Sequence, residues 1–294
     1  MQLILRYLIT ALLVFASFWT SADSAGIDAH PFAIETAGQG RSVYLVSGLS
    51  NAGDVWDDLA ARLRQAGYRT HVLTLSGFGG RPALGDGPFL PPVRDALAVE
   101  LAQRERRKPV VIGHSLGGFL AFWLGATESR HLAGIIAIDG VPFLPALGDP
   151  SATPESQAAS AEGIRSFMAS LSHEQLARQS RMSLQAMLQD ESERERIVQT
   201  STRSDPAAMS RAVAELMTTD LRSLMTDVAV PELLLQAADS GSNPALRAAF
   251  GAQIAAIPEH RHVVAERGSH FIQLDDPEFT AREVLAFLEA LGDE

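Results

Sequence analysis

Residues 110–118 read Val-Val-Ile-Gly-His-Ser-Leu-Gly-Gly, and this stretch decides the fold. A short β-branched run ends in the pattern Gly113-x-Ser115-x-Gly117, and an apolar, helix-compatible segment follows from Phe119 to Ala126. The order predicts a strand, a tight turn and a helix in immediate succession. A serine at the apex of so sharp a turn has a strained backbone, and side chains at 113 and 117 would collide with the neighbouring strand and helix. Ser115 is therefore predicted to point away from the sheet beside a helix N-terminus, where a serine can act as a nucleophile.

The same five-residue pattern also occurs by chance in loops rich in glycine and serine. A strand before it and a helix after it distinguish a catalytic serine from such a loop, and both are predicted here. The alternative reading is a plain turn between a strand and a helix.

The first 25 residues read as a secretory signal peptide. The apolar run Tyr7–Trp19 is too short to span a bilayer comfortably, and the small residues after it offer a cleavage site at Thr20-Ser21-Ala22 or Ala22-Asp23-Ser24. We therefore expect an exported protein, periplasmic or secreted, with no stable membrane insertion after cleavage. The alternative is an uncleaved N-terminal anchor.

Composition restricts the class of protein further. The chain contains no cysteine, which excludes disulfides and a lipid-modified N-terminal cysteine, so an exported form needs a large core. The roughly 270 residues left after cleavage can supply one, as a single large α/β domain or as one domain with an insertion. The net charge is −11 and the basic residues are scattered, so we expect no nucleic-acid partner.

Short β-branched or aliphatic runs alternate with longer helical patterns, which is typical of a mostly parallel sheet with helices on both faces. The runs predicted as strands are Val43–Ser47, Thr70–Leu75, Pro109–Ile112, Gly134–Ile138, Glu232–Gln236 and His260–Ala265, with Pro31–Ala37 as an antiparallel edge strand. The segments predicted as helices are Val55–Ala66, Val93–Arg106, Leu116–Ala126, Pro244–Ile254 and Pro277–Leu291. Asp275-Asp276 before Pro277 marks the start of the last helix.

One interval of some ninety residues, from Asp139 to Pro231, contains no good strand. Its apolar residues recur at helical spacing, and Ser204-Asp205-Pro206 is a helix-start signal within it. We therefore predict a helical lid over 150–224, inserted into an α/β core formed by 26–149 and 225–294. The alternative is disorder in the polar parts near 151–162 and 189–204.

A serine hydroxyl becomes a nucleophile when a histidine accepts its proton and a carboxylate orients that histidine. Among eight histidines, His270 is the best placed, because it follows the last predicted strand and so lies at the same sheet edge as Ser115. His114 is next to the serine in sequence, but the turn points it elsewhere. We expect no catalytic metal, because neither an H-E-x-x-H motif nor a Cys/His cluster is present.

Two aspartates are candidates for the orienting acid. Asp239 follows the strand before the histidine, and Asp139 ends the strand Gly134–Ile138. Both would lie at the carboxyl edge of the sheet. The chain order Ser…Asp…His favours Asp239, and Asp139 is the alternative.

The negative charge that develops on a reacting carbonyl oxygen requires two N–H donors. The backbone of Leu116, directly after the serine, can supply one, and Leu49 in the open loop after Val43–Ser47 can supply the other. Four aromatic side chains are candidates for an apolar substrate pocket, although each one alone is more often a plain core residue: Phe78, Phe119, Phe143 and Phe271.

Together, Gly-His-Ser-Leu-Gly-Gly, Ser47-Gly48-Leu49 with Trp56, Leu75-Ser76-Gly77-Phe78-Gly79, Asp239 and Gly268-Ser269-His270 resemble the α/β-hydrolase superfamily, and in particular its capped, esterase-like members. The resemblance covers nearly all of the chain after the signal peptide, except the lid. It implies a Ser/Asp/His triad without a cofactor, which falls on Ser115, Asp239 and His270. The family often has His-Gly before the oxyanion residue, where this chain has Ser47-Gly48.

These inferences predict an exported serine hydrolase that cleaves small-molecule carboxylic esters through an acyl-enzyme. A C–C bond hydrolase or a lactonase would use the same triad. A non-catalytic ligand-binding protein on the same fold is a third reading, since fold does not fix function.

Overall fold

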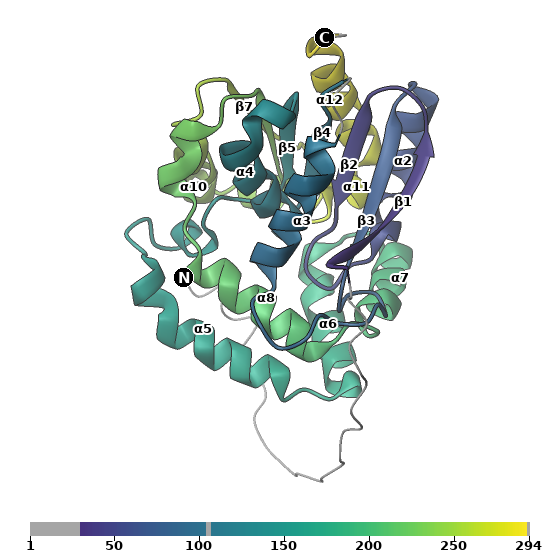
Figure 1. The fold of residues 1–294 in the computed structure, drawn as a ribbon. Coiled ribbons are helices and arrows are strands. Elements are labelled where there is room, and N and C mark those ends of the chain that lie inside the picture. The colour runs from purple at the N-terminus through teal and green to yellow at the C-terminus, as the bar shows by residue number, and fades with distance from the viewer. Residues whose placement is uncertain (1–29, 104–106, 293–294) are drawn as a thin grey trace.

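A seven-stranded sheet runs through the centre of the protein, with its strands in the order β1-β3-β2-β4-β5-β6-β7 (Figure 1). The computed structural model describes residues 30–103 and 107–292, so the predicted signal peptide lies outside the described residues. Strands β2 to β7 are parallel, and β1 pairs with β3 in the antiparallel sense. The strands are β1 (Phe32–Gly38), β2 (Ser42–Val46), β3 (Arg69–Leu75), β4 (Val110–His114), β5 (Gly134–Ile138), β6 (Glu232–Gln236) and β7 (His260–Val264).

All seven strands match predicted runs to within two residues, and the antiparallel edge strand is confirmed. The interior strands β2, β4, β5 and β6 are buried at every position. A parallel strand covered by helices on both faces needs apolar side chains in both directions, which explains the continuous aliphatic runs in the sequence.

Helices cover both faces of this sheet (Figure 1). On one face, Leu97, Leu120 and Phe250 belong to a single buried cluster; on the other, Leu59 and Val284 belong to a second. The core helices are α2 (Asp57–Gln65), α3 (Leu90–Ala102), α4 (Leu116–Glu128), α9 (Ala238–Gly241), α10 (Pro244–Ile254), α11 (Ile272–Asp275) and α12 (Pro277–Ala290). Within the described ranges, no helix is both long and apolar enough to cross a membrane.

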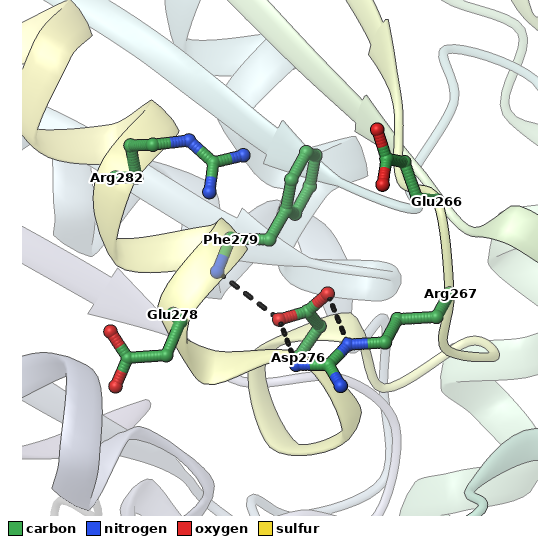
Figure 2. A pocket seen from close by; sticks show the side chains of 6 residues that line it. All are labelled: Glu266, Arg267, Asp276, Glu278, Phe279 and Arg282. Carbon is green, nitrogen blue, oxygen red and sulfur yellow. Dashed lines mark hydrogen bonds and ion pairs between the residues drawn. The ribbon is translucent and has the colours of Figure 1, made fainter.

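The last helix, α12, begins where its start signal predicts. The Asp276 carboxylate accepts the Phe279 backbone N–H at 3.2 Å, which satisfies one of the free donors of the first turn. The same carboxylate forms an ion pair with Arg267 at 2.7 Å, so the cap also fastens the loop that leads away from β7 (Figure 2).

Four α-helices occupy the long interval between β5 and β6, inside the predicted range 150–224. They are α5 (Pro154–Ala169), α6 (His173–Met187), α7 (Glu191–Ser201) and α8 (Pro206–Thr218). Each begins at a side-chain cap: Thr153, Ser172, Asp190 and Asp205. The polar parts near 151–162 and 189–204 are therefore helical, as the spacing of the apolar residues predicts, and not disordered as their polar composition alone would suggest.

Hydrogen bonds join this helical insertion to loops that follow strands β2, β3 and β7. The Ser204 hydroxyl donates to the Ser50 carbonyl at 2.9 Å and accepts the Gly79 backbone N–H at 3.0 Å. The Gln189 N–H donates to the Asp275 carboxylate at 2.8 Å. Parallel strands end at a common edge, so the insertion lies against the carboxyl edge of the sheet.

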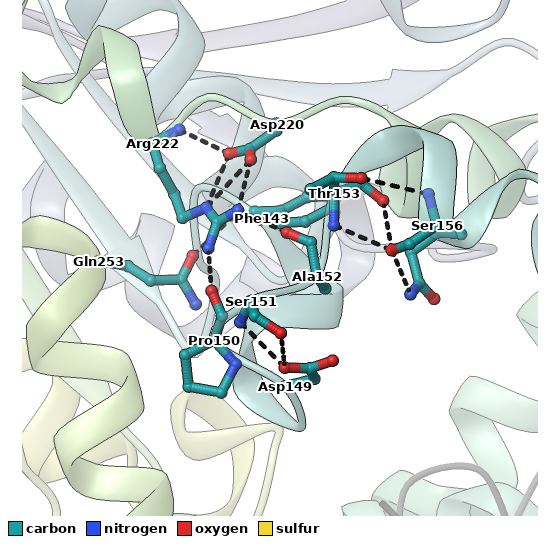
Figure 3. Close-up of polar contacts among 11 residues, drawn as sticks. Phe143, Asp149, Pro150, Ser151, Ala152, Thr153, Ser156, Asp220, Arg222 and Gln253 are labelled. Carbon is teal, nitrogen blue, oxygen red and sulfur yellow. Dashed lines mark hydrogen bonds and ion pairs between the residues drawn. The ribbon is translucent and has the colours of Figure 1, made fainter.

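Arg222 ties the two ends of the insertion together (Figure 3). Its guanidinium donates to the carbonyls of Pro150 at 2.8 Å and Ala152 at 2.7 Å, where the insertion begins. It also pairs with Asp220 at 2.6 Å, where the insertion ends, and lies 4.8 Å over the Phe143 ring. The Arg222 side chain therefore holds together the first and last residues of a segment of about 70 residues.

Glu232, at the start of β6, is the least expected core residue. It is 1% exposed, and within the described structure neither carboxylate oxygen has a hydrogen-bond partner. Because side chains alternate along a strand, Glu232 shares the face of Leu234, which packs into the larger apolar cluster. Burial raises its pKa well above the usual value of a glutamate.

We expect the variant Glu232→Gln to remove a pH dependence from the protein's stability. A carboxyl whose pKa is raised by folding stabilises the fold fully below its unfolded pKa, and this contribution is lost as pH rises through the folded pKa. The loss is about 1.4 kcal/mol for each unit of the shift. The Tm of the variant relative to the wild type should therefore increase between about pH 5 and pH 8.

Glu259→Gln is the matched control, because Glu259 is exposed on the neighbouring loop. Thermal unfolding of the three proteins across this pH range is the measurement. A Tm difference for Glu232→Gln that stays constant with pH would contradict the raised pKa, because Glu232 would then have the same pKa in the folded and the unfolded protein.

Candidate active site

Ser115 lies at the sharp turn between β4 and α4, and its backbone has a φ of +54°. L-residues rarely adopt this conformation, so the turn stores strain at this serine. The glycines on either side are required sterically. A Cβ at Gly113 would lie 1.9 Å from the Gly117 carbonyl oxygen, and one at Gly117 would lie 2.0 Å from the Val46 carbonyl oxygen. The turn predicted from Gly-x-Ser-x-Gly is confirmed, and so is the steric reason for it.

Two backbone segments flank Ser115. Leu116 is the first residue of α4, a position whose N–H has no carbonyl partner within the helix. On the other side, Gly48 lies so close that a Cβ there would be 3.2 Å from the Ser115 Cβ. Leu49, the second predicted oxyanion donor, follows Gly48 directly, so its loop is beside the serine.

The loop that carries Leu49 is held by its own hydrogen bonds. The Ser47 hydroxyl donates to the Ala52 carbonyl at 2.8 Å, and the Asn51 N–H donates to the Gly48 carbonyl at 3.2 Å. Ser47 is fully buried beneath this turn. Ser47 therefore closes this loop rather than lining a site.

His270 forms its ring contact with Asp139. The His270 Nδ1 donates to Asp139 Oδ2 at 2.6 Å, and Asp139 Oδ1 accepts the Ala237 backbone N–H at 2.9 Å. The two side chains are 21% and 8% exposed, so the pair is largely shielded from solvent. With both oxygens engaged, Asp139 fixes the ring orientation and places the remaining proton of a neutral imidazole on Nδ1. This leaves Nε2 free to accept a proton.

The pairing of His270 with Asp239, favoured by chain order, is not the one in the structure. Asp239 is exposed in the short helix α9, and its carboxylate accepts the Ser269 hydroxyl at 2.6 Å. The chain turns into α9 directly after β6, which carries Asp239 past the ring. The Asp139 backbone, at a φ of +47°, instead turns its side chain toward His270.

Ser115 and the Asp139–His270 pair share one edge of the sheet. The Ser115 N–H donates to the Ile138 carbonyl at 2.9 Å, directly before Asp139. A Cβ at Gly140 would lie 2.7 Å from the Ser115 carbonyl oxygen, so the two loops are in contact. The ends of β4, β5 and β7 thus carry Ser115, Asp139 and His270 at one edge of the sheet.

His114 contributes to this arrangement in a way that the sequence did not indicate. It is fully buried, and its Nε2–H donates to the His270 carbonyl at 2.9 Å. Burial lowers its pKa well below the usual value of a histidine, and the neighbouring His270 lowers it further. His114 is therefore a neutral residue that holds the loop of His270.

The four aromatic residues predicted to line a pocket are buried in three separate clusters. Phe78 and Phe119 belong to the larger core cluster, Phe271 to the second, and Phe143 to a small one at the base of the insertion. Phe271 is the one that contacts a histidine of the site: its ring centroid lies 5.5 Å from that of His270. The structure does not bring the other three to this ring.

Two surface hollows lie apart from Ser115. One, of about 580 Å³, lies beside the start of α12 (Figure 2). The other, of about 590 Å³, lies between the loop after β3 and the insertion. Among residues 30–103 and 107–292, no group of His, Asp or Glu side chains is arranged to hold a metal ion.

A mostly parallel sheet with a strained serine at a strand-to-helix turn defines the α/β-hydrolase fold. The family model described as "Alpha/beta hydrolase family" matches residues 43–283, so the chain belongs to this family.

The chain is 27% identical over 268 residues to a pimeloyl-(acyl-carrier protein) methyl ester esterase of Aliivibrio salmonicida, a match that covers 87% of this chain and 95% of that protein. An esterase from Exiguobacterium antarcticum superposes with a TM-score of 0.74 at 16% identity, over 88% of this chain and 95% of that one. An enol-lactonase from Burkholderia xenovorans superposes with a TM-score of 0.68 at 17% identity, over 88% and 96%. The two structural likenesses concern the fold alone.

Proposed function

We propose that the protein is a serine hydrolase that cleaves carboxylic esters of small molecules through an acyl-enzyme. The observation that carries the proposal is the strained Ser115 at the sheet edge where Asp139 holds the His270 ring at 2.6 Å. A relative named as a methyl ester esterase, aligned over 95% of its own length, supports the choice of esters.

In the first half of the reaction, Ser115 Oγ attacks the ester carbonyl while His270 Nε2 takes its proton. The carbonyl oxygen becomes negative and accepts hydrogen bonds from the N–H groups of Leu49 and Leu116. The intermediate collapses as the bond to the alcohol breaks, and His270 returns the proton to the leaving alcohol. Asp139 stabilises the transient imidazolium throughout.

In the second half, a water molecule attacks the acyl group on Ser115. His270 now takes a proton from the water and delivers it to Ser115 Oγ as the acid leaves. The cycle needs no cofactor, because each proton moves between groups of the chain and the reactants.

The helical insertion is assigned the role of a lid over this site. Its hydrogen bonds to the loops after β2, β3 and β7 support this role, because those loops surround the carboxyl edge of the sheet. The clamp of Arg222 on both ends of the insertion keeps it in place as one unit. Its helices and the aromatic side chains beneath them would then shape the acyl pocket.

The experiment that tests the proposal traps the acyl-enzyme. Incubation with a short-chain aryl ester, followed by acid quenching, should raise the protein mass by one acyl group on Ser115. Added methanol should divert part of the acyl group to the methyl ester, since both nucleophiles compete for one intermediate. Hydrolysis without such partitioning would contradict the mechanism.

A substrate panel distinguishes the other chemistries that a Ser/His/Asp site performs. We expect turnover of acyl esters to exceed that of an enol-lactone and of a diketone cleaved at a C–C bond. Faster turnover of the lactone would identify a lactonase. A folded protein that turns over none of the three and does not react with a fluorophosphonate would be a binding protein.

We also propose that the protein is exported and that its signal peptide lies within residues 1–25. The apolar run Tyr7–Trp19 and the small residues after it support this. When the full sequence is expressed in a bacterium, the N-terminus of the product should be Asp23 or Ala25, as found by mass spectrometry of the cell fractions. A product that retains Met1 in the membrane fraction would contradict cleavage and show an anchor.

A further inference from the structure

The hollow of about 590 Å³ lies where the insertion meets the core. Its walls are the loop after β3, the end of α5 and the starts of α6 and α8. Gly80 forms part of the lining, and a Cβ there would lie 3.5 Å from the Arg203 Cβ. The residues around it that carry charge or can gain it are Arg81, His173, Arg203 and Asp205.

Two arginines of this hollow lack partners. In the described part of the chain, neither the Arg81 nor the Arg203 guanidinium has an ion pair or a side-chain hydrogen bond, and the Arg81 Nε is buried with nothing to accept its proton. A buried donor without an acceptor is costly, so its presence beside an open space indicates a ligand with an acceptor atom. Most arginines elsewhere on the insertion are paired, as Arg165 is with Glu162.

The charged side chains that line the hollow sum to a positive charge, although the chain as a whole carries a net charge of −11. Two guanidinium groups are present against one carboxylate, Asp205, whose Oδ1 is engaged by the N–H groups of Ala207 and Ala208. Helices α6 and α8 both begin at this hollow, so the positive ends of two helix dipoles add to the arginines.

The hollow is also joined to the loop beside Ser115. Arg203 precedes Ser204, and the Ser204 hydroxyl links the Ser50 carbonyl to the Gly79 N–H. Ser50 follows Leu49, the proposed oxyanion donor, and has a strained φ of +63°. A ligand held by Arg81 and Arg203 would therefore lie one residue away from the contact that fixes this loop.

We propose that this hollow is a binding site for an anionic group, a carboxylate or a phosphate, held by Arg81 and Arg203. The planar guanidinium groups suit both, because each presents two parallel donors to two oxygens. The site itself requires no chemistry at Ser115. Its use by a substrate, as the place for an acidic group distant from the scissile ester, rests on the proposed function.

Direct binding tests the site independently of catalysis. Isothermal titration of inorganic phosphate and of glutarate into the full protein should show saturable binding at one site. Arg203→Gln should weaken it by about tenfold, as expected for the loss of one charge-assisted contact in a site with a second arginine. Arg203 is exposed, so this variant should fold normally.

The matched control is Arg178→Gln, which removes the same charge from an exposed position of α6. It should leave the affinity unchanged. Arg81→Gln provides a second variant, checked by its Tm. The absence of saturable binding to the wild type, or equal weakening by Arg178→Gln and Arg203→Gln, would overturn the proposal.

Kinetics then identify the source of the anion. If the substrate carries it, phosphate should compete with a half-ester of a dicarboxylic acid, and Arg203→Gln should raise KM for that ester but not for a neutral methyl ester. If a free anion binds there, phosphate should change the turnover of the neutral ester, and Arg203→Gln should abolish that change. A protein that binds phosphate but hydrolyses neither ester would retain the site and contradict the proposed function instead.

Discussion

Replacement of Ser115 by alanine is expected to lower kcat for ester hydrolysis by about 10⁶-fold. The acyl-enzyme cannot form without Oγ, and the residual rate then comes from the N–H groups of Leu49 and Leu116 and from substrate binding alone. The same variant should fail to react with a fluorophosphonate that labels the wild type. The variant should still fold. Alanine is smaller than serine, and the Ser115 side chain does not cap α4 with a hydrogen bond that the substitution would remove.

The control for the labelling is Ser166→Ala, which changes an exposed serine of α5. Its labelling and turnover should equal those of the wild type. Labelling of Ser115→Ala at wild-type rate would place the nucleophile elsewhere in the chain, and the assignment of the strand-to-helix turn as the reactive site would be wrong.

The sheet could be predicted from the sequence because its signals are local. β5 and β6 run over the predicted residues, since an interior parallel strand is an aliphatic run that starts and stops abruptly. The helices of the insertion were predictable for a similar reason: Asp205 before Pro206 caps α8, and apolar residues recur along it.

Contacts between distant segments were not predictable from such signals. Glu215 of α8 accepts the N–H groups of Phe89 and Leu90 at 2.6 and 2.7 Å and so caps the core helix α3 from within the insertion. Nothing in either segment alone marks this contact, because a glutamate on a helix is ordinary. Arg222 at the base of the insertion is a case of the same kind.

The predicted contact between Asp239 and His270 is absent for a related reason. Chain order placed Asp139 and Asp239 at the same edge of the sheet, and both are there. Which of them contacts His270 depends on the turn that follows each strand. Asp139 adopts a positive φ that the sequence does not indicate, since Asp-Gly occurs in many turns.

The variant Asp139→Asn is expected to lower kcat by about 10⁴-fold. An amide at this position can donate to His270 Nδ1, which moves the ring proton to Nε2, and the ring can then no longer accept the proton of Ser115. Asparagine tolerates the positive φ of residue 139, so the substitution changes the chemistry without adding backbone strain. Steady-state kinetics with the preferred aryl ester, after a Tm measurement to confirm folding, are the test.

Asp239→Asn is the matched comparison, because it makes the same change on the neighbouring loop. Its remaining carbonyl oxygen can still accept the Ser269 hydroxyl, and the side chain is exposed, so kcat should fall by no more than about twofold, or ~0.4 kcal/mol. If Asp239→Asn were the more damaging variant, the acid would act from the position that chain order favours, and His270 would have to leave Asp139 during catalysis. Equal large losses would instead mean that Asp239, through Ser269, positions the histidine loop as firmly as Asp139 orients the ring.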